Sequence, residues 1–104
     1  MKEKNTKQIK IELKEEIAQG NYVNLSIIGF SQAEFILDFI KIIPGISKAD
    51  VKSRMIMSPM HTKNLLLLLN AKIKDYEKKF GKIQSPKQKI KPSSIKLPDD
   101  VLPN

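Results

Sequence analysis

The sequence predicts an α+β domain in which an antiparallel meander of about four strands is followed by one long C-terminal helix (59–80) and an extended tail. Apolar and polar residues alternate over several stretches of the first 57 residues, the period of a strand with one buried face. A helix-start signal then precedes about 22 residues with apolar side chains three to four positions apart. The length of 104 residues leaves room for one domain.

The first two expected strands lie on either side of a turn. Residues 1–7 are polar and charged, and we expect them to form a disordered lead-in. Residues 9–13 alternate isoleucine and leucine with charged side chains, which predicts an edge strand. Turn chemistry at Gly20 and Asn21 precedes a second alternating stretch, residues 22–28, which predicts the next strand.

Residues 32–43 fit two periods. As a helix, the stretch would begin with Ser31 and Glu34 as a capping box. As a strand, it would point its phenylalanines inward and Glu34 and Asp38 outward. We favour the strand because the connection at residues 31–33 is short enough for a hairpin.

Residues 50–57 alternate again and predict a last strand, with Val51, Met55 and Met57 on one side and Lys52 and Arg54 on the other.

The clearest local signal of the sequence marks the start of the helix. Ser at position 58 and Pro at position 59 are typical of an N-cap followed by the first helical residue. The glycine at position 81 predicts the C-terminal end of this helix.

The helix carries more apolar residues than one sheet can cover. A stripe at helical spacing is expected to pack on the sheet; it consists of Leu65, Leu69, Ile73, Tyr76 and Phe80. Leu66 and Leu67 lie off that stripe, so the middle of the helix is apolar all round. We therefore expect Leu66 and Leu67 to form an oligomer interface, in a homodimer or a larger homo-oligomer.

We expect a single domain over residues 8–81. Residues 82–104 are rich in proline and lysine, which predicts a basic, disordered tail. The first residues lack the apolar segment of a secretory signal, so we expect a cytoplasmic protein without a membrane segment.

The residue types give no support for an enzyme. His61 is the single histidine and the chain has no cysteine, so we expect no metal site and no cofactor. Glu34 and Asp38 are expected on a solvent-facing polar side without a nearby nucleophile. Ser58 is explained by its role as a helix cap. The expectation is a non-enzymatic protein.

The formal net charge of +8 leaves a nucleic-acid-associated protein as an alternative function. No aromatic platform accompanies the lysines, so we do not favour it. Arg54 is the single arginine, with Lys52 close by in sequence. The two could bind an anion, or Arg54 could pair with Asp38 or Glu34 on a neighbouring strand; we favour the ion pair.

Several short blocks of residues stand out by their order and spacing. They are Ile9-x-Ile11-x-Leu13-x-Glu15-Glu16, Gly20-x-Tyr22-x-Asn24-Leu25, Ser31-x-x-Glu34-Phe35-x-Leu37-Asp38-Phe39, Pro44-Gly45, Ser53-Arg54-x-Ile56-Met57-Ser58-Pro59-x-His61 and Tyr76-Glu77-x-x-Phe80-Gly81. With these blocks the chain resembles a family of short bacterial proteins catalogued only as a domain of unknown function. The resemblance covers residues 9 to about 83 and implies no activity and no catalytic residues.

The preferred function is an uncharacterised non-enzymatic interaction module that assembles with itself and has an unknown protein partner. A meander followed by a helix is also similar, at the level of fold alone, to the export chaperone SecB. A SecB-like chaperone or scaffold is therefore a further alternative, suited by the adaptable side chains of Met55, Met57 and Met60. We expect instead that these methionines fill the core under the helix.

Overall fold

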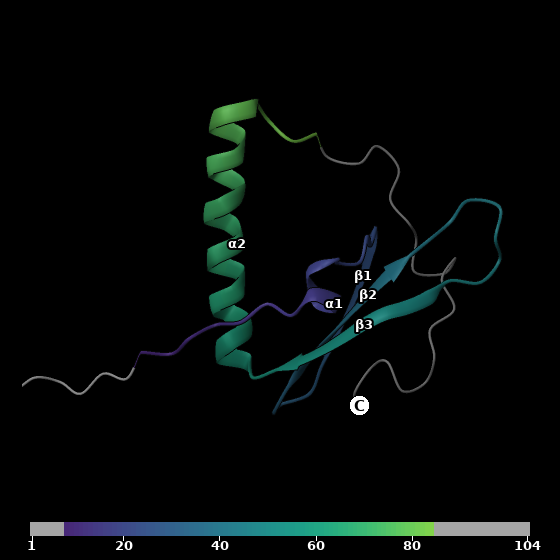
Figure 1. The fold of residues 1–104 in the computed structure, drawn as a ribbon, viewed down its shortest axis with the longest axis horizontal. Coiled ribbons are helices and arrows are strands. Elements are labelled where there is room, and N and C mark those ends of the chain that lie inside the picture. Colours follow the sequence, from purple (N-terminus) through teal and green to yellow (C-terminus); the bar gives the residue numbers. More distant parts are fainter. Residues whose placement is uncertain (1–7, 85–104) are drawn as a thin grey trace, which may run out of the picture.

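The structure, a computed structural model, describes residues 8–84. The expected lead-in at residues 1–7 and the tail from residue 85 onward lie outside the described residues. The chain forms a short helix α1 (Glu15–Ala18), three strands and a long helix α2 (Pro59–Phe80). The α+β class and the order of a meander before one long helix are confirmed (Figure 1).

The described sheet has three strands in the order β1-β2-β3. They are β1 (Leu25–Phe30), β2 (Phe35–Lys41) and β3 (Asp50–Met57), and each neighbouring pair is antiparallel. The central strand β2 therefore has partners on both sides, while β1 and β3 each have one open edge. A single residue, Ser58, separates the end of β3 from the start of α2.

The prediction of a strand at residues 9–13 is wrong for the single chain. These residues belong to no described helix or strand, and α1 follows them instead of a turn. An alternating segment becomes a strand only when it pairs with another strand, and the backbone of residues 9–13 makes no hydrogen bond to the open edge of β1 or of β3 in the described chain. Figure 1 shows the segment as an open, uncoiled chain that leads away from α1.

The second strand begins at Leu25, three residues later than residue 22, where the sequence placed it. The side chain of Asn24 supports the pairing of β1 with β2 at this end. Its Oδ1 accepts a hydrogen bond from the backbone N–H of Ile42 at 2.8 Å, and its Nδ2 donates to the Ile42 carbonyl at 3.0 Å.

Residues 35–41 form a strand, as favoured, and not a helix. Ser31 contributes to the reason, because its Oγ accepts from the backbone N–H groups of Ala33 and Glu34 at 3.3 Å each. The Ser31 N–H also donates to the Glu34 carbonyl at 2.9 Å. These bonds close a hairpin turn between β1 and β2, so the residues of the expected capping box serve a turn.

Strand β3 matches its predicted bounds but not its predicted faces. Phe39 pairs with Ser53 while Ile40 pairs with Val51, so Lys52 is the extra residue of a bulge. Because facing residues lie on the same side of a sheet, Val51 shares the side of Ile40 and Arg54. The alternation alone predicts Val51 on the same side of the sheet as Met55. The extra residue at the bulge moves Val51 to the opposite side.

Helix α2 has the bounds that the sequence predicted. The Ser58 Oγ accepts from the His61 N–H at 3.2 Å, and Pro59 occupies the first turn. Gly81 ends the helix with a φ of 96° and donates its N–H to the Glu77 carbonyl at 2.9 Å. A positive φ of this size favours glycine, so the sequence signal and the backbone agree.

The apolar core is small, and α2 does not complete it. Among the described residues, Leu37 and Ile40 of β2 are the buried hydrophobic side chains, with 7% and 6% exposed. Figure 1 shows α2 standing to one side of the sheet instead of lying across it. The expected packing of α2 on the sheet is therefore wrong. The expected core role is also wrong for Met55 and Met60, which are exposed, while Met57 is half-buried.

Candidate functional site

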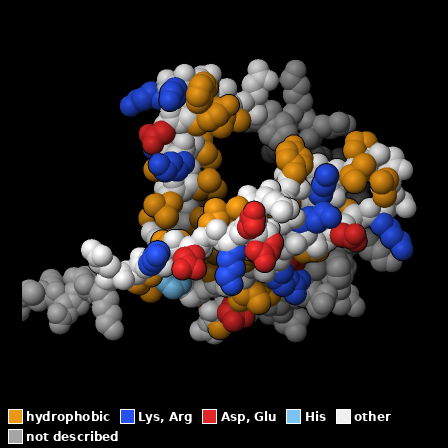
Figure 2. Space-filling view, in the orientation of Figure 1, with side chains coloured by type: hydrophobic (Ala, Val, Ile, Leu, Met, Phe, Trp, Pro, Cys, Tyr) orange, Lys and Arg blue, Asp and Glu red, His pale blue; other side chains and the backbone are white. Residues whose placement is uncertain are grey.

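The most distinctive surface of the described chain is the uncovered apolar surface of α2. Its centre is the leucine segment, Leu65–Leu69, in which five consecutive side chains are between 38% and 58% exposed. Ile73, Tyr76 and Phe80 continue this surface toward the end of the helix and are exposed as well. Figure 2 shows hydrophobic side chains along α2 with no described element over them. We call these eight residues the α2 surface.

The α2 surface runs around more than one side of the helix. Successive residues of an α-helix are rotated by about 100°, so Leu66 and Leu67 point in different directions from Leu65. Leu66 is 58% exposed and Leu67 57%, which are values close to those of their neighbours. A helix that is apolar all round is normally buried on all sides.

The exposed area is large for a protein of this size. With about 200 Å² for a large apolar side chain, the exposed fractions of the α2 surface correspond to on the order of 800 Å². The largest apolar patch of a typical monomer is about 300–600 Å². A standard protein–protein interface takes about 800 Å² from each partner. The α2 surface therefore has the size of an interface.

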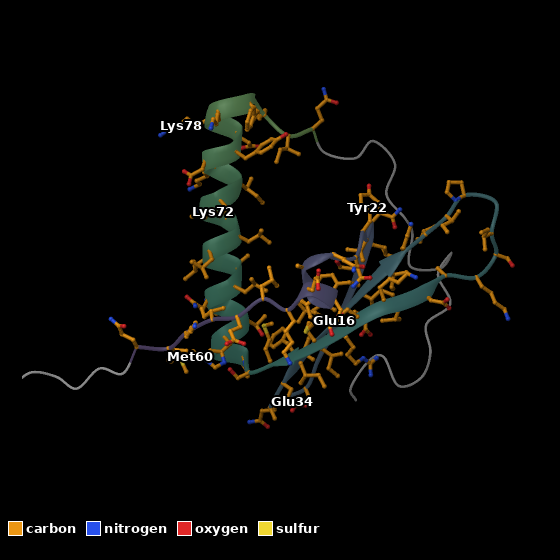
Figure 3. The ribbon with its side chains drawn as sticks, viewed as in Figure 1. Glu16, Tyr22, Glu34, Met60, Lys72 and Lys78 are labelled. Carbon is orange, nitrogen blue, oxygen red and sulfur yellow. The ribbon has the colours of Figure 1, made fainter. Side chains whose placement is uncertain are left out.

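The charged residues of α2 are divided between different sides of the helix. By helical spacing, Lys63, Lys74 and Lys78 share a side with Leu67, whereas Lys72 and Lys79 lie nearer to Leu68. Figure 3 shows Lys78 on the side of α2 that points away from the sheet. The lysines therefore do not gather into one continuous basic stripe along the helix.

The second feature of the site region is an ion pair across the sheet. Arg54 of β3 lies opposite Asp38 of β2. Its Nε donates to Asp38 Oδ1 at 2.8 Å and its Nη2 donates to Oδ2 at 2.9 Å. The side chain of Asp38 is fully buried, and that of Arg54 is 34% exposed. The paired geometry explains how a carboxylate is tolerated inside so small a core.

The expectation that Asp38 faces solvent is wrong. Strand alternation places it on a polar side, but both sides of the central strand are covered at this position. Of the two carboxylates offered as partners for Arg54, Asp38 is the one in contact, while Glu34 is exposed. The Nε and Nη2 groups of Arg54 are thus engaged by Asp38, which supports the ion pair over an anion site as the role of this side chain. Lys52 itself is exposed at the bulge of β3.

His61 has a structural place at the start of α2. Its Nδ1 lies 3.0 Å from Ser58 Oγ, the same oxygen that accepts from the His61 N–H. Within residues 8–84, no three His, Cys, Asp or Glu side chains lie close enough together to hold a metal ion. Neither helix of the described chain has the length and apolar character needed to cross a membrane.

These observations define a class of protein: a small α+β protein with a three-stranded meander, a protruding long helix, and a candidate site that is a surface. Residues 1–85 match the family model described as Protein of unknown function (DUF3467), and the chain belongs to that family. No curated protein and no solved structure matches the chain.

Proposed function

We propose that this protein is a non-enzymatic interaction module that assembles into a homo-oligomer through the α2 surface. The observation that carries the proposal is the exposure of the leucine segment on more than one side of a helix that contacts its own sheet little. Burying this surface removes on the order of 800 Å² of apolar area from water, which favours association at about 25 cal/mol per Å² before the costs of association.

A second copy of the chain is the partner that fits this surface best. It brings an α2 surface that is equally uncovered, and it also brings exposed apolar residues of the sheet, among them Ile28, Phe30 and Met55. Copies related by a two-fold axis can cover each other with the same residues, which is the commonest way in which soluble oligomers form. Two equal surfaces of this size give the area of a standard interface.

The direct test is the mass of the particle in solution, measured by light scattering on a sizing column. The native chain is expected to elute as a dimer or a larger oligomer. The double substitution Leu66→Gln and Leu67→Gln is expected to lower the mass toward that of one chain. Glutamine keeps the side-chain length and a good helix propensity, so the helix should persist. Far-ultraviolet circular dichroism checks this.

The matched control is Lys78→Gln with Lys79→Gln, which places the same new residues on the same helix outside the leucine segment. This control should keep the native mass. A native chain of monomeric mass would contradict the proposal, and so would an L66Q/L67Q protein that keeps its helix and the full oligomeric mass.

A further inference from the structure

The segment before α1 carries the pattern of a strand but has no partner. Ile9, Ile11 and Leu13 are 84%, 90% and 70% exposed. Within residues 8–84, the backbone of residues 9–13 makes no hydrogen bond to another segment. We call residues 8–14 the N-terminal arm. An exposed chain of alternating apolar residues with free backbone groups is a template for pairing with another strand.

The sequence of the arm is complementary to itself in one arrangement. If two arms run antiparallel with Ile11 of one opposite Ile11 of the other, each Ile9 faces a Leu13. In the same register each Lys10 faces a Glu12 of the other copy. All six apolar side chains then lie on one side of the pair and the opposite charges meet on the other side. Facing pairs of both kinds stabilise antiparallel strands.

The other simple arrangements lack this complementarity. A parallel pair in register would place Lys10 against Lys10 and Glu12 against Glu12, and like charges directly opposite are destabilising. An antiparallel pair centred on Glu12 would face Lys10 with Lys14. A pair centred on Lys10 would leave Leu13 opposite residue 7, a lysine. The charge pattern therefore selects the register centred on Ile11.

We propose that the N-terminal arm pairs with the same segment of a second copy, antiparallel and centred on Ile11. An isolated two-stranded ribbon is marginally stable in water, so the pairing rests on the proposed assembly through α2, which holds two arms near each other. The arm then adds a second, self-complementary contact to the oligomer, and its specificity for this chain comes from the alternation of lysine and glutamate.

The chain contains no cysteine, so one introduced cysteine reports on one contact. In the proposed register, Ile11→Cys places two thiols directly across the two-fold axis. Facing residues have Cα atoms about 4.5–5.5 Å apart, which a disulfide can bridge. We expect mild oxidation to convert I11C into a covalent dimer at least tenfold faster than Lys14→Cys. The two copies of position 14 would be about 20 Å apart, at about 3.4 Å per residue.

A mixture of two variants tests the direction of the strands. Ile9→Cys and Leu13→Cys should cross-link slowly when each is alone and rapidly when the two are mixed, because position 9 faces position 13 only in the antiparallel arrangement. If I9C alone and L13C alone cross-link as fast as I11C, the arms are parallel and the proposal is overturned. It is also overturned if I11C reacts no faster than K14C.

The charges of the arm provide a rescue experiment. In the I11C background, Glu12→Lys should slow cross-linking several-fold because it places lysine opposite lysine. Adding Lys10→Glu restores opposite charges and should restore the rate. An unchanged rate in I11C/E12K would contradict the charge-selected register. Since these side chains are exposed in the single chain, the substitutions leave its own contacts intact.

The same samples separate this inference from the proposed function. Light scattering under reducing conditions gives the mass of each variant independently of cross-linking. An oligomer that depends on Leu66 and Leu67, but whose I11C variant does not cross-link above the K14C control, refutes the arm pairing alone. Rapid I11C cross-linking in the L66Q/L67Q background at full oligomeric mass supports the arm and refutes assembly through α2.

Discussion

Asp38 shows how one polar residue can be accommodated at the centre of a very small core. It is the buried charged residue among those described, and both of its oxygens are bonded to Arg54 on the adjacent strand. The pair fixes the facing positions of β2 and β3 next to the bulge at Lys52. Removing one partner would leave the other charge without compensation in a partly desolvated place.

The expected effect of Asp38→Ala is a loss of about 3 kcal/mol in the free energy of unfolding. Urea denaturation at a fixed protein concentration measures it. Glu34→Ala, an exposed carboxylate on the same hairpin, should change stability by less than about 0.5 kcal/mol. Replacing both partners, with Asp38→Leu and Arg54→Met, should recover most of the loss because no charge is left buried. A D38A protein as stable as E34A would show that the ion pair contributes little.

At the scale of elements, local signals predicted where the chain changes conformation. Ser58, Pro59 and Gly81 set both ends of α2, because capping depends on neighbouring backbone groups. The burial of Asp38 could not be predicted, because it depends on contacts on both sides of β2. The packing of α2 could not be predicted either: spacing shows which residues of a helix share a side but not what lies opposite.

The candidate site was predicted in part. The apolar excess around Leu66 and Leu67 is visible in the sequence, and it marked the centre of the α2 surface. Sequence reasoning missed that Leu65, Leu69 and Ile73 are exposed too, because it assigned them to the sheet. The run of five leucines could have indicated the wider surface, because consecutive residues of a helix point to all of its sides. The prediction of an edge strand at residues 9–13 was wrong for the single chain, because whether an alternating segment meets a strand to pair with is a tertiary property.

Hydrogen exchange should distinguish α2 from the sheet. If the α2 surface is covered by assembly, amides of the leucine segment will exchange more slowly as the protein concentration rises, because association suppresses local opening of the helix. Mass spectrometry of peptides spanning residues 65–73 measures this rate. Peptides from β2 should respond less, since its hydrogen bonds to β1 and β3 lie within one chain. Equal exchange of α2 at all concentrations would count against the proposal.

At the scale of the molecule, the small core links folding to association. Two buried apolar side chains supply little of the stabilisation that a domain needs against its conformational entropy. The uncovered α2 surface offers a much larger apolar area, which would stabilise the folded chain if it were buried in an oligomer. The folded state of this chain should therefore depend on the formation of the oligomer, as in many obligate dimers.

The melting temperature should consequently rise with protein concentration. For a dimer that dissociates as it unfolds, each tenfold increase in concentration adds about 1.4 kcal/mol per dimer, which corresponds to an increase of a few degrees. Circular dichroism melts over a hundredfold range of concentration measure the shift. The L66Q/L67Q variant should melt at a lower temperature that no longer depends on concentration. A native melting temperature independent of concentration would contradict the link between folding and assembly.

The leucine segment has a further consequence inside a cell. A newly synthesised copy that has not yet assembled exposes five consecutive leucines, and chaperones and proteases bind exposed hydrophobic segments of this kind. Unassembled copies would then be degraded, whereas copies within the oligomer would be protected from degradation. The steady-state amount of this protein should show a threshold in its rate of synthesis, below which it scarcely accumulates.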